Sequence, residues 1–292
     1  MNEFTFIKDY KHHDVHRQSF LDLAQHVFGI NFEPWYKKGY WSDNYICYSY
    51  LHNNNVVANV SVNIMDLLIN GTSTKSIQLG TVMTHPDYRK KGLAANLIQK
   101  VFQDYDHQVD FSFLFANETV LDFYPKFGYH SHTETQYSTI LPDSSDKASH
   151  QIRQLQPSEL CDMTLLLDIY RKNKIKSRTF SVNNAEHLLT FYSLNVYHSN
   201  IYYIENKQLI LIYFMENNVC HLIDVMSSNE LSFRDIRKYL PNSEEVVFHF
   251  TPSFSEIEMK KIANIMENSV LFVRPSSDSF PSEFTFPKLA HS

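Results

Sequence analysis

HPDYRKKGLAANLIQKVF, residues His85–Phe102, is the stretch that decides the fold of this chain. It predicts the end of a strand, then a basic loop, then a helix. After the loop, apolar residues recur in pairs every four positions, which places them on one face of a helix. These apolar residues are Leu93, Ala94, Leu97, Ile98, Val101 and Phe102. Gly92 is therefore expected at or near the N-terminus of this helix.

The first turn of the helix is suited to holding a phosphate group. Its first backbone N–H groups lack acceptors within the helix, and the helix dipole is positive at this end. Gly92 carries no side chain that would keep a phosphate away from the backbone. Counter-charge comes from the residues just before it, Arg89, Lys90 and Lys91. The loop Arg89–Ala94 is therefore a predicted anion site.

The same loop resembles a family motif. Arg89, Gly92 and Ala94 fit the spacing Arg/Gln-x-x-Gly-x-Gly/Ala, the acetyl-CoA signature of the GCN5-related N-acetyltransferases, or GNAT superfamily. The preceding Leu79–Pro86 has the strand-then-proline form that this family places before its loop. Further on, Asn117–Tyr129 is similar to the family's second signature, an asparagine, a helix, a tyrosine and a Phe-Gly-Tyr ending. The resemblance covers roughly residues 1–140.

The resemblance implies an α/β (α+β) fold, in which a mixed, largely antiparallel sheet is flanked by helices. The element order from the sequence agrees with this fold. Helices are predicted at Val15–Phe28, which ends at Gly29, and after Gly92. Predicted strands lie at residues 4–7, 45–50, 56–62, 64–69, 77–83 and 109–115. Asparagine-rich turns at His52–Asn55 and Asn70–Gly71 suit hairpins, because asparagine tolerates positive φ.

The second half is predicted to be a degenerate copy of the first. The polar stretch Pro142–Ser149 is the predicted boundary between a GNAT domain at 1–142 and a GNAT-like domain at 150–292. Beyond it, strands are predicted at residues 152–155, 201–204, 209–214, 220–225 and 245–250, and helices at residues 158–170 and 231–240. The tail from Pro275 to Ser292 is expected to be extended, and either docked or disordered.

The distribution of glycine predicts which half binds the cofactor. All six glycines lie in the first half of the chain. At the equivalent junction the second half offers Met226–Glu230, which suits a helix N-cap but adds an acid where a pyrophosphate needs positive charge. The second half is therefore expected to bind no acetyl-CoA in this way and to serve as a lid or as a wall of the substrate pocket.

Composition limits the partners of the chain. A length of 292 residues predicts two domains, and 43% hydrophobic residues are ample for their cores. The net charge of −6 argues against a nucleic-acid-binding surface. By resemblance the acceptor is a small-molecule amine, and the acidic balance favours cationic amines such as aminoglycosides or polyamines. Whether the chain forms a homo-oligomer is left open by the sequence.

The cysteines and the N-terminus predict the compartment. Cys47, Cys161 and Cys220 are far apart and form no Cys-x-x-Cys pair, which fits a reducing compartment and argues against a zinc knuckle. The chain opens with an acidic residue, Glu3, where a signal peptide would be basic. No apolar run approaches the roughly 20 residues that a membrane helix needs. We therefore expect a cytoplasmic protein without a membrane segment.

The resemblance implies a role for each residue of the two signatures. The backbone of Val82, Met83 and Thr84 would pair with the pantetheine arm of acetyl-CoA like an added strand. The pyrophosphate would lie in the loop formed by Arg89, Lys90, Lys91, Gly92, Leu93 and Ala94. Asn117 would bind or position the pantetheine arm. Tyr124 would be the general acid, because a tyrosine with a pKa near 10 is protonated at neutral pH. The alternative for Tyr124 is simple packing.

The sequence does not identify a general base. Glu33, Asp66 and Glu118 are candidates, and each is alternatively a surface carboxylate. Two-lobed relatives of the enhanced-intracellular-survival type use a terminal carboxylate near the site. The resemblance to them implies that the Ser292 carboxylate lies there, while their third, sterol-carrier-like domain is not expected within these 292 residues.

Two other groups of residues have open interpretations. Trp35 and Trp41 lie in a segment that lines the acceptor pocket in the family, and they could equally cap the core. His12, His13 and His16 have the spacing of a metal cluster, but no cysteine is near, and solvated surface histidines are the favoured interpretation. We therefore predict no metal.

The predicted function is transfer of an acetyl group from acetyl-CoA to a primary amine by direct attack. The rival interpretation is a non-catalytic acyl-CoA-binding or scaffold protein that kept the fold and lost the acceptor site. A third interpretation is that the site takes a longer acyl chain.

Overall fold

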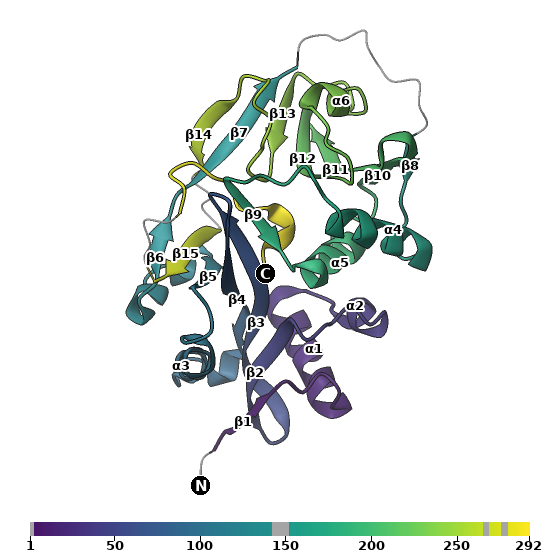
Figure 1. Cartoon of the computed structure of the whole chain (residues 1–292). Coiled ribbons are helices and arrows are strands. Elements are labelled where there is room, and N and C mark those ends of the chain that lie inside the picture. Colours follow the sequence, from purple (N-terminus) through teal and green to yellow (C-terminus); the bar gives the residue numbers. More distant parts are fainter. Residues whose placement is uncertain (1–2, 142–151, 265–268, 276–279) are drawn as a thin grey trace.

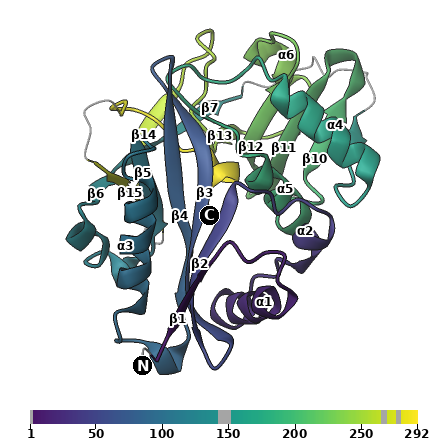
Figure 2. The same ribbon diagram turned by 60° about the horizontal axis from the view of Figure 1, so that its bottom comes forward.

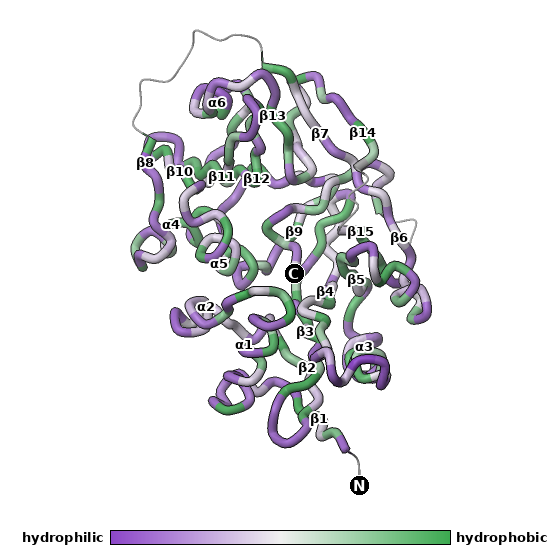
Figure 3. The backbone as a smooth tube through the Cα atoms, turned by 180° about the vertical axis from the view of Figure 1, so that it is seen from behind, coloured by the Kyte–Doolittle hydropathy of each residue, from purple (hydrophilic) through white to green (hydrophobic). Residues whose placement is uncertain are grey.

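The computed structural model describes residues 3–141, 152–264, 269–275 and 280–292. Two mixed, mostly antiparallel sheets with helices on their faces form an α+β fold in two lobes, as predicted (Figure 1). Hydrophobic segments concentrate in the strands of both sheets, and hydrophilic segments in the outer loops (Figure 3). Within the described ranges, no helix combines the length and hydropathy that a bilayer crossing requires.

The elements of the first lobe follow one another as in a mixed α/β unit. Its strands are β1 (Thr5–Lys8), β2 (Tyr45–His52), β3 (Asn55–Ile69), β4 (Thr72–Thr84), β5 (Phe111–Ala116) and β6 (His130–His132). Its α-helices are α1 (Asp14–Phe28), α2 (Glu33–Lys37) and α3 (Leu93–Tyr105). Short 3₁₀ turns lie at η1 (Pro86–Tyr88), η2 (Glu118–Val120) and η3 (Tyr124–Phe127).

The remaining elements build the second lobe and return to the first. The strands are β7 (Glu134–Ile140), β8 (Arg153–Gln154), β9 (Phe180–Asn183), β10 (Ile201–Ile204), β11 (Leu209–Glu216), β12 (Val219–Ser227), β13 (Glu245–Phe248), β14 (Lys260–Asn264) and β15 (Val270–Arg274). The helices and 3₁₀ turns are α4 (Leu160–Arg171), α5 (Glu186–Asn195), α6 (Phe233–Arg237), η4 (Glu205–Lys207) and η5 (Lys288–Ala290).

Two predicted hairpins organise the first sheet. The β2–β3 turn has positive φ at Asn53 and Asn54 (49° and 66°), and the β3–β4 turn has it at Asn70 and Gly71 (49° and 81°). Paired positive φ values are typical of the type I′ turn, whose twist matches that of the flanking strands. The asparagine signals in the sequence therefore predicted both turns correctly.

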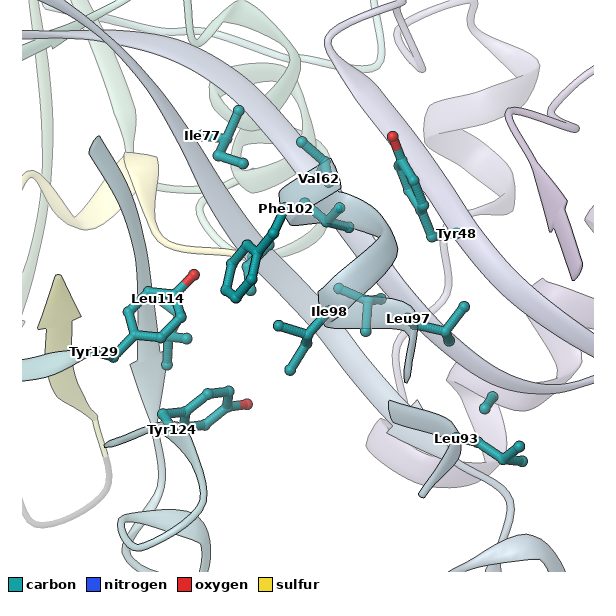
Figure 4. Packing of buried hydrophobic residues seen from close by; sticks show 14 of the residues in the cluster. Tyr48, Val62, Ile77, Leu93, Leu97, Ile98, Phe102, Leu114, Tyr124 and Tyr129 are labelled. Atoms are coloured by element: carbon teal, nitrogen blue, oxygen red, sulfur yellow. The ribbon is translucent and has the colours of Figure 1, made fainter. Parts of the chain in front are cut away.

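Helix α3 packs on the first sheet as its periodicity predicts. Its buried residues are Leu93, Leu97, Ile98, Val101 and Phe102, and they join residues of β2, β3, β4 and β5 in one core cluster (Figure 4). Each fully buried aliphatic or aromatic side chain of this kind contributes about 1.5–3 kcal/mol relative to an exposed one. This packing fixes the N-terminus of α3, and hence the loop before it, against the ends of β4 and β5.

The parallel strands β4 and β5 pair only over a short distance and then diverge. Their ladder joins Ser76–Gln78 to Phe111–Phe113. Beyond it, β4 continues to Thr84 and β5 to Ala116 without pairing to each other. Thr81 has a φ of 46°, where the register between β3 and β4 shifts. The bulge turns the end of β4, and a gap opens between the two strands.

The two sheets exchange strands. β7, which follows the first lobe in sequence, lies between β14 and β13 in the second sheet. β15, near the end of the chain, lies between β5 and β6 in the first sheet. Main-chain hydrogen bonds therefore connect the sequence halves on both sides. The predicted boundary at Pro142–Ser149 lies outside the described residues, and the division into domains at 1–142 and 150–292 stays a prediction.

Several predicted elements need correction. The helix expected after Asn117 is replaced by the turns η2 and η3, because Pro125 cannot continue a helical hydrogen-bond ladder and Gly128 (φ 83°) ends the turn. Helix α6 is capped by Ser232 in a capping box with Asp235, rather than by Met226–Glu230. β6, β7, β9, β14 and β15 were not predicted, because pairing with distant strands, rather than a local period, defines them. Helix α5 was not predicted either.

The C-terminal segment, residues 280–292, is docked between the two sheets. Figure 2 shows the C mark between the first sheet and α5. Phe284 and Phe286 are buried. The carbonyl oxygen of Phe284 accepts from Thr135 N (2.7 Å), and Phe286 N donates to the Glu134 carboxylate (2.6 Å). Of the two sequence interpretations, docking is therefore correct for these residues.

The buried carboxyl group of Glu134 makes stability depend on pH. Glu134 is 5% exposed, and burial raises the pKa of its carboxyl group from 4.5 to about 7, although the Phe286 N–H and Lys288 act in the opposite direction. Between these two pH values, the unfolded chain loses the proton and the folded chain keeps it. The free energy of unfolding therefore contains a contribution that falls as the pH rises through this range.

The substitution Glu134→Gln removes this titration and keeps an oxygen that can accept from Phe286. Relative to the parent protein, we expect the variant to gain about 3 kcal/mol of stability as the pH rises from 4.5 to about 7. Urea denaturation of both proteins across this range measures the difference. Glu205→Gln, at an exposed position, is the control. A difference for Glu134→Gln that does not change with pH would contradict the prediction.

Candidate active site

A cavity of about 890 Å³ lies where β4 and β5 diverge. Its walls come from the α1–α2 connection, β2, the end of β4, the start of α3, the segment after β5, helix α5 and the last two residues of the sequence. The strand gap, the basic loop and the second lobe thus meet at one opening. Most of the residues that the sequence analysis assigned to a site are found here.

The predicted binding residues divide into two groups. Val82, Met83, Thr84, Arg89, Lys90, Ala94, Asn117 and Tyr124 line the cavity. Lys91, Gly92 and Leu93 do not line it. Lys91 turns away toward β1, where its ammonium group lies 3.4 Å from Glu3 and 5.4 Å from the ring centre of Phe4. Leu93 is buried in the core beneath α3.

Gly92 shapes the loop without lining the cavity. It is the N-cap of α3 and has a φ of 75°, in the left-handed region that favours glycine. Lys90 also has a positive φ, of 62°, and the Arg89 guanidinium donates from Nε to the carbonyl oxygen of Thr84 (3.3 Å). The backbone geometry therefore holds the N–H groups at the start of α3 next to the end of β4.

The end of β4 offers backbone groups to the cavity. The bulge at Thr81 is held by Asn59, whose Nδ2 donates to the Thr81 carbonyl oxygen (3.0 Å), and by Tyr45, whose hydroxyl lies 2.8 Å from Thr81 Oγ1. Because β5 has diverged, the edge of β4 that faces it has no strand partner there among the described residues. Such an edge can pair with an extended ligand.

Asn117 organises the segment that follows β5. Its side-chain oxygen accepts from Thr119 N (3.0 Å) and from Thr119 Oγ1 (2.6 Å), which caps the turn η2. Asn117 and Thr119 both line the cavity. The asparagine of the second signature therefore fixes the cavity wall opposite β4.

Tyr124 projects from the turn η3 into the same region. It is 5% exposed, and its ring packs beside those of Phe123, Tyr129 and Phe272, at centroid distances of 5.2, 6.1 and 6.0 Å. Figure 4 shows Tyr124 next to Tyr129 in the core cluster below α3. Burial raises the pKa of the Tyr124 phenol to about 12. Its hydroxyl makes no hydrogen bond to any described residue.

None of the side-chain carboxylates proposed as a base lines the cavity. Glu33 pairs with Lys37 (2.9 Å) at the start of α2, and Asp66 accepts from Asn184. Glu118 lies in the exposed turn η2. Among the described residues that line the cavity, no side chain is aspartate or glutamate. The sequence placed these acids near the motifs, whereas the fold turns them outward.

The last residues of the sequence contribute a wall that the motifs did not predict. His291 stacks on Phe115 of β5, with ring centres 3.7 Å apart, and burial holds its pKa well below the ordinary value. Ser292 lies so close to Gly80 that a Cβ added at Gly80 would be 2.1 Å from Ser292 Oγ. The resemblance to two-lobed relatives had implied that Ser292 lies near the site, and the glycine inside a strand at Gly80 was a further signal of this close approach.

Helix α5 of the second lobe, which the sequence did not predict, also lines the cavity through Leu188, Phe191 and Tyr192. It is joined to α2 by Trp35, whose indole N–H donates to the His187 carbonyl oxygen and to Thr190 Oγ1, both at 3.0 Å. Trp35 therefore lines the cavity and also packs in the core. Trp41 does not line the cavity and packs in the core alone.

Two histidines near the N-terminus, His13 and His16, contribute to the start of helix α1. His13 caps α1 by accepting from His16 N (3.4 Å), and the two rings stack with centres 3.9 Å apart. Across the described ranges, no group of three or more histidine, cysteine, aspartate or glutamate side chains has a geometry that could hold a metal ion.

The first lobe is similar to a known protein family. Residues 7–131 match the family model described as an acetyltransferase (GNAT) domain. This range contains β4, the basic loop, α3 and Tyr124. No match was found among curated proteins.

Solved structures share the two-lobed fold across nearly the whole chain. A conserved protein of unknown function from Enterococcus faecalis V583 has a TM-score of 0.62 at 14% identity, covering 93% of this chain and 72% of that protein. Eis1 from Mycobacterium abscessus has a TM-score of 0.58 at 12% identity, with the same coverage of 93% and 72%. A GCN5-related N-acetyltransferase from Kribbella flavida has a TM-score of 0.56 at 15% identity, covering 93% and 71%. At these identities the likeness is one of fold.

The loop geometry predicts that Gly92→Val weakens binding of acetyl-CoA by at least about tenfold, because a β-branched residue is strained at positive φ. A Cβ at Gly92 would meet nothing within 4 Å, so the effect comes from the backbone alone. Titration calorimetry with acetyl-CoA measures the affinity. Gly39→Val is the matched control, since Gly39 has a similar φ of 78°, equally open surroundings and no place in the cavity wall. Unchanged affinity in Gly92→Val would mean that acetyl-CoA binds elsewhere.

Proposed function

Because this chain belongs to the GNAT superfamily and has the fold of its two-domain members, we propose that it transfers an acetyl group from acetyl-CoA to a primary amine. The observation that carries the proposal is the edge of β4 that faces β5, which has no strand partner beyond Gln78 among the described residues. This edge leads directly into the basic loop and the N-terminus of α3. Tyr124 lies in the wall of the same cavity. The free edge of β4, the basic loop and Tyr124 therefore face one cavity, where they would act as the binding edge, the anion site and the proton donor.

The chain has the groups that acetyl-CoA needs. The amides of the pantetheine arm would pair with the backbone of Val82, Met83 and Thr84, in place of the missing strand. The pyrophosphate would accept from the first N–H groups of α3, with Arg89 and Lys90 as counter-charges. Lys91 is assigned no contact with it, since Lys91 faces Glu3. Asn117 would position the arm through the turn that it caps.

The proposed reaction is a direct transfer. The lone pair of the neutral amine attacks the thioester carbonyl carbon, so that a C–N bond forms and the C–S bond breaks. The amine loses one proton, and the departing thiolate of CoA gains one. Holding both substrates in one cavity turns a bimolecular step into an effectively unimolecular one.

Tyr124 is the proposed donor to the thiolate. Since its pKa is raised to about 12, the phenol keeps its proton throughout the neutral range and is available to donate. The amine must also lose a proton. The resemblance to two-lobed relatives, which use a terminal carboxylate, implies that the carboxylate of Ser292 accepts this proton, and Ser292 lines the cavity. No aspartate or glutamate side chain in the described cavity wall competes for this role.

The proposal predicts that Tyr124→Phe lowers kcat by about a hundredfold or more, because the thiolate loses its proton donor. The affinity for acetyl-CoA should stay close to that of the parent, since the ring still packs against Phe123 and Tyr129. Release of CoA thiol, followed at saturating acetyl-CoA across an amine panel, measures the rate. Tyr50→Phe is the control, because Tyr50 packs against the same core outside the cavity.

Three outcomes separate the interpretations. A large loss of kcat with retained binding supports the catalytic role of Tyr124. An unchanged rate would remove that role and leave Tyr124 as a packing residue. Tight binding of acetyl-CoA without turnover of any amine, in the parent protein as well, would favour the non-catalytic acyl-CoA-binding protein.

A further inference from the structure

One part of the cavity wall is apolar. It combines the α1–α2 connection of the first lobe with α5 of the second. The side chains that form it are Val27, Phe28, Ile30, Phe32, Leu188 and Phe191. A bound group in this region would therefore replace water against aliphatic and aromatic surface, which favours burial of an apolar group.

Charged side chains are few in the cavity wall. The charged side chains among its described lining residues are Arg89 and Lys90, and both are cationic. A polyamine or an aminoglycoside carries several ammonium groups. The proposed acceptor at Ser292 would partner at most one of them, and burying the others without a carboxylate is unfavourable. Cation–π attraction to an aromatic wall is too weak to offset the burial of several charges. The cavity wall therefore disfavours binding of acceptors with several positive charges, which the acidic composition of the sequence had favoured.

The apolar wall is held in place by packing between the lobes. Phe32 and Phe191 lie with ring centres 5.0 Å apart, and Phe32 also contacts Trp35 at 6.1 Å. Trp35 is anchored to α5 through its two hydrogen bonds to His187 and Thr190. The position of α5 relative to α2 is therefore set before any substrate arrives, and a preformed apolar surface lowers the entropy cost of binding.

We propose that the acceptor is a monoamine carrying an aryl or alkyl group, which packs between Phe32, Leu188 and Phe191. Its amine would point toward the bulge of β4 at Thr81, and the reaction is the acetyl transfer described above. This inference rests on the proposed function, and it names the substrate class of that site.

The test compares amines on the full chain with acetyl-CoA. We expect kcat/KM for 2-phenylethylamine and hexylamine to exceed that for spermidine and kanamycin by at least about tenfold. A preference for spermidine and kanamycin, which carry several positive charges, would overturn the inference and leave the proposed function intact. Calorimetric binding of the same amines decides the inference even if no amine is acetylated, an outcome that would count against the proposed function alone.

Variants locate the apolar group. Phe191→Asp adds a carboxylate to the wall, and we expect kcat/KM for 2-phenylethylamine to fall by at least about tenfold while that for spermidine rises. Phe28→Asp makes the same change at a residue that is 44% exposed, where a charge disturbs folding less. It replaces Phe191→Asp if that variant does not fold. Val196→Asp is the matched control, at the end of α5, 49% exposed and outside the cavity wall. Phe191→Leu should retain the parent preference.

A second series identifies which substrate carries the apolar group. Acetyl-, butyryl- and hexanoyl-CoA are compared at a fixed amine in the parent and in both aspartate variants. The inference expects the variants to alter the preference among amines and to leave the preference among acyl chains unchanged. If the acyl-chain preference shifts while the amine preference stays constant, the wall holds the acyl group and the inference fails.

Discussion

The divergence of β4 from β5 is the constraint on which the rest of the structure depends. Parallel strands that separate after a short ladder leave backbone donors and acceptors without partners, and such groups need a ligand, water or another segment. The bulge at Thr81, fixed by Asn59 and Tyr45, directs the free edge toward the N-terminus of α3. Because α3 packs on the same sheet, the free edge of β4 and the N-terminus of α3 are held at a fixed position relative to each other.

The C-terminal segment joins the two lobes at the closed end of this gap. The Gln78 side chain, oriented to satisfy both of its polar groups, donates to the Ala290 carbonyl oxygen (3.1 Å) and accepts from Ser292 N (2.9 Å). Gly80 leaves the space that Ser292 fills. The exchanged strands β7 and β15 hold the sheets together on either side. A single set of contacts therefore shapes the cavity and connects the lobes.

The two ends of the cavity differ in chemistry because they come from different segments. Arg89 and Lys90 stand at the loop end, where an anion fits. The opposite end is built by α2 and α5, whose interface is a cluster of aromatic rings. Under the proposed function, the phosphates of the donor would lie at the loop end, and the body of the acceptor would lie against the apolar wall.

The local features could be predicted from the amino-acid sequence: both asparagine hairpins, helix α3, the glycine at its N-cap and the two motifs that carry Arg89, Asn117 and Tyr124. Hydrophobic period and φ preference act within a few residues, so the sequence shows them directly. The strand exchange, the place of α5 in the cavity wall, the direction of Lys91 away from the cavity and the approach of Ser292 to Gly80 became known from the fold alone. These depend on contacts between segments far apart in sequence, which no local pattern encodes.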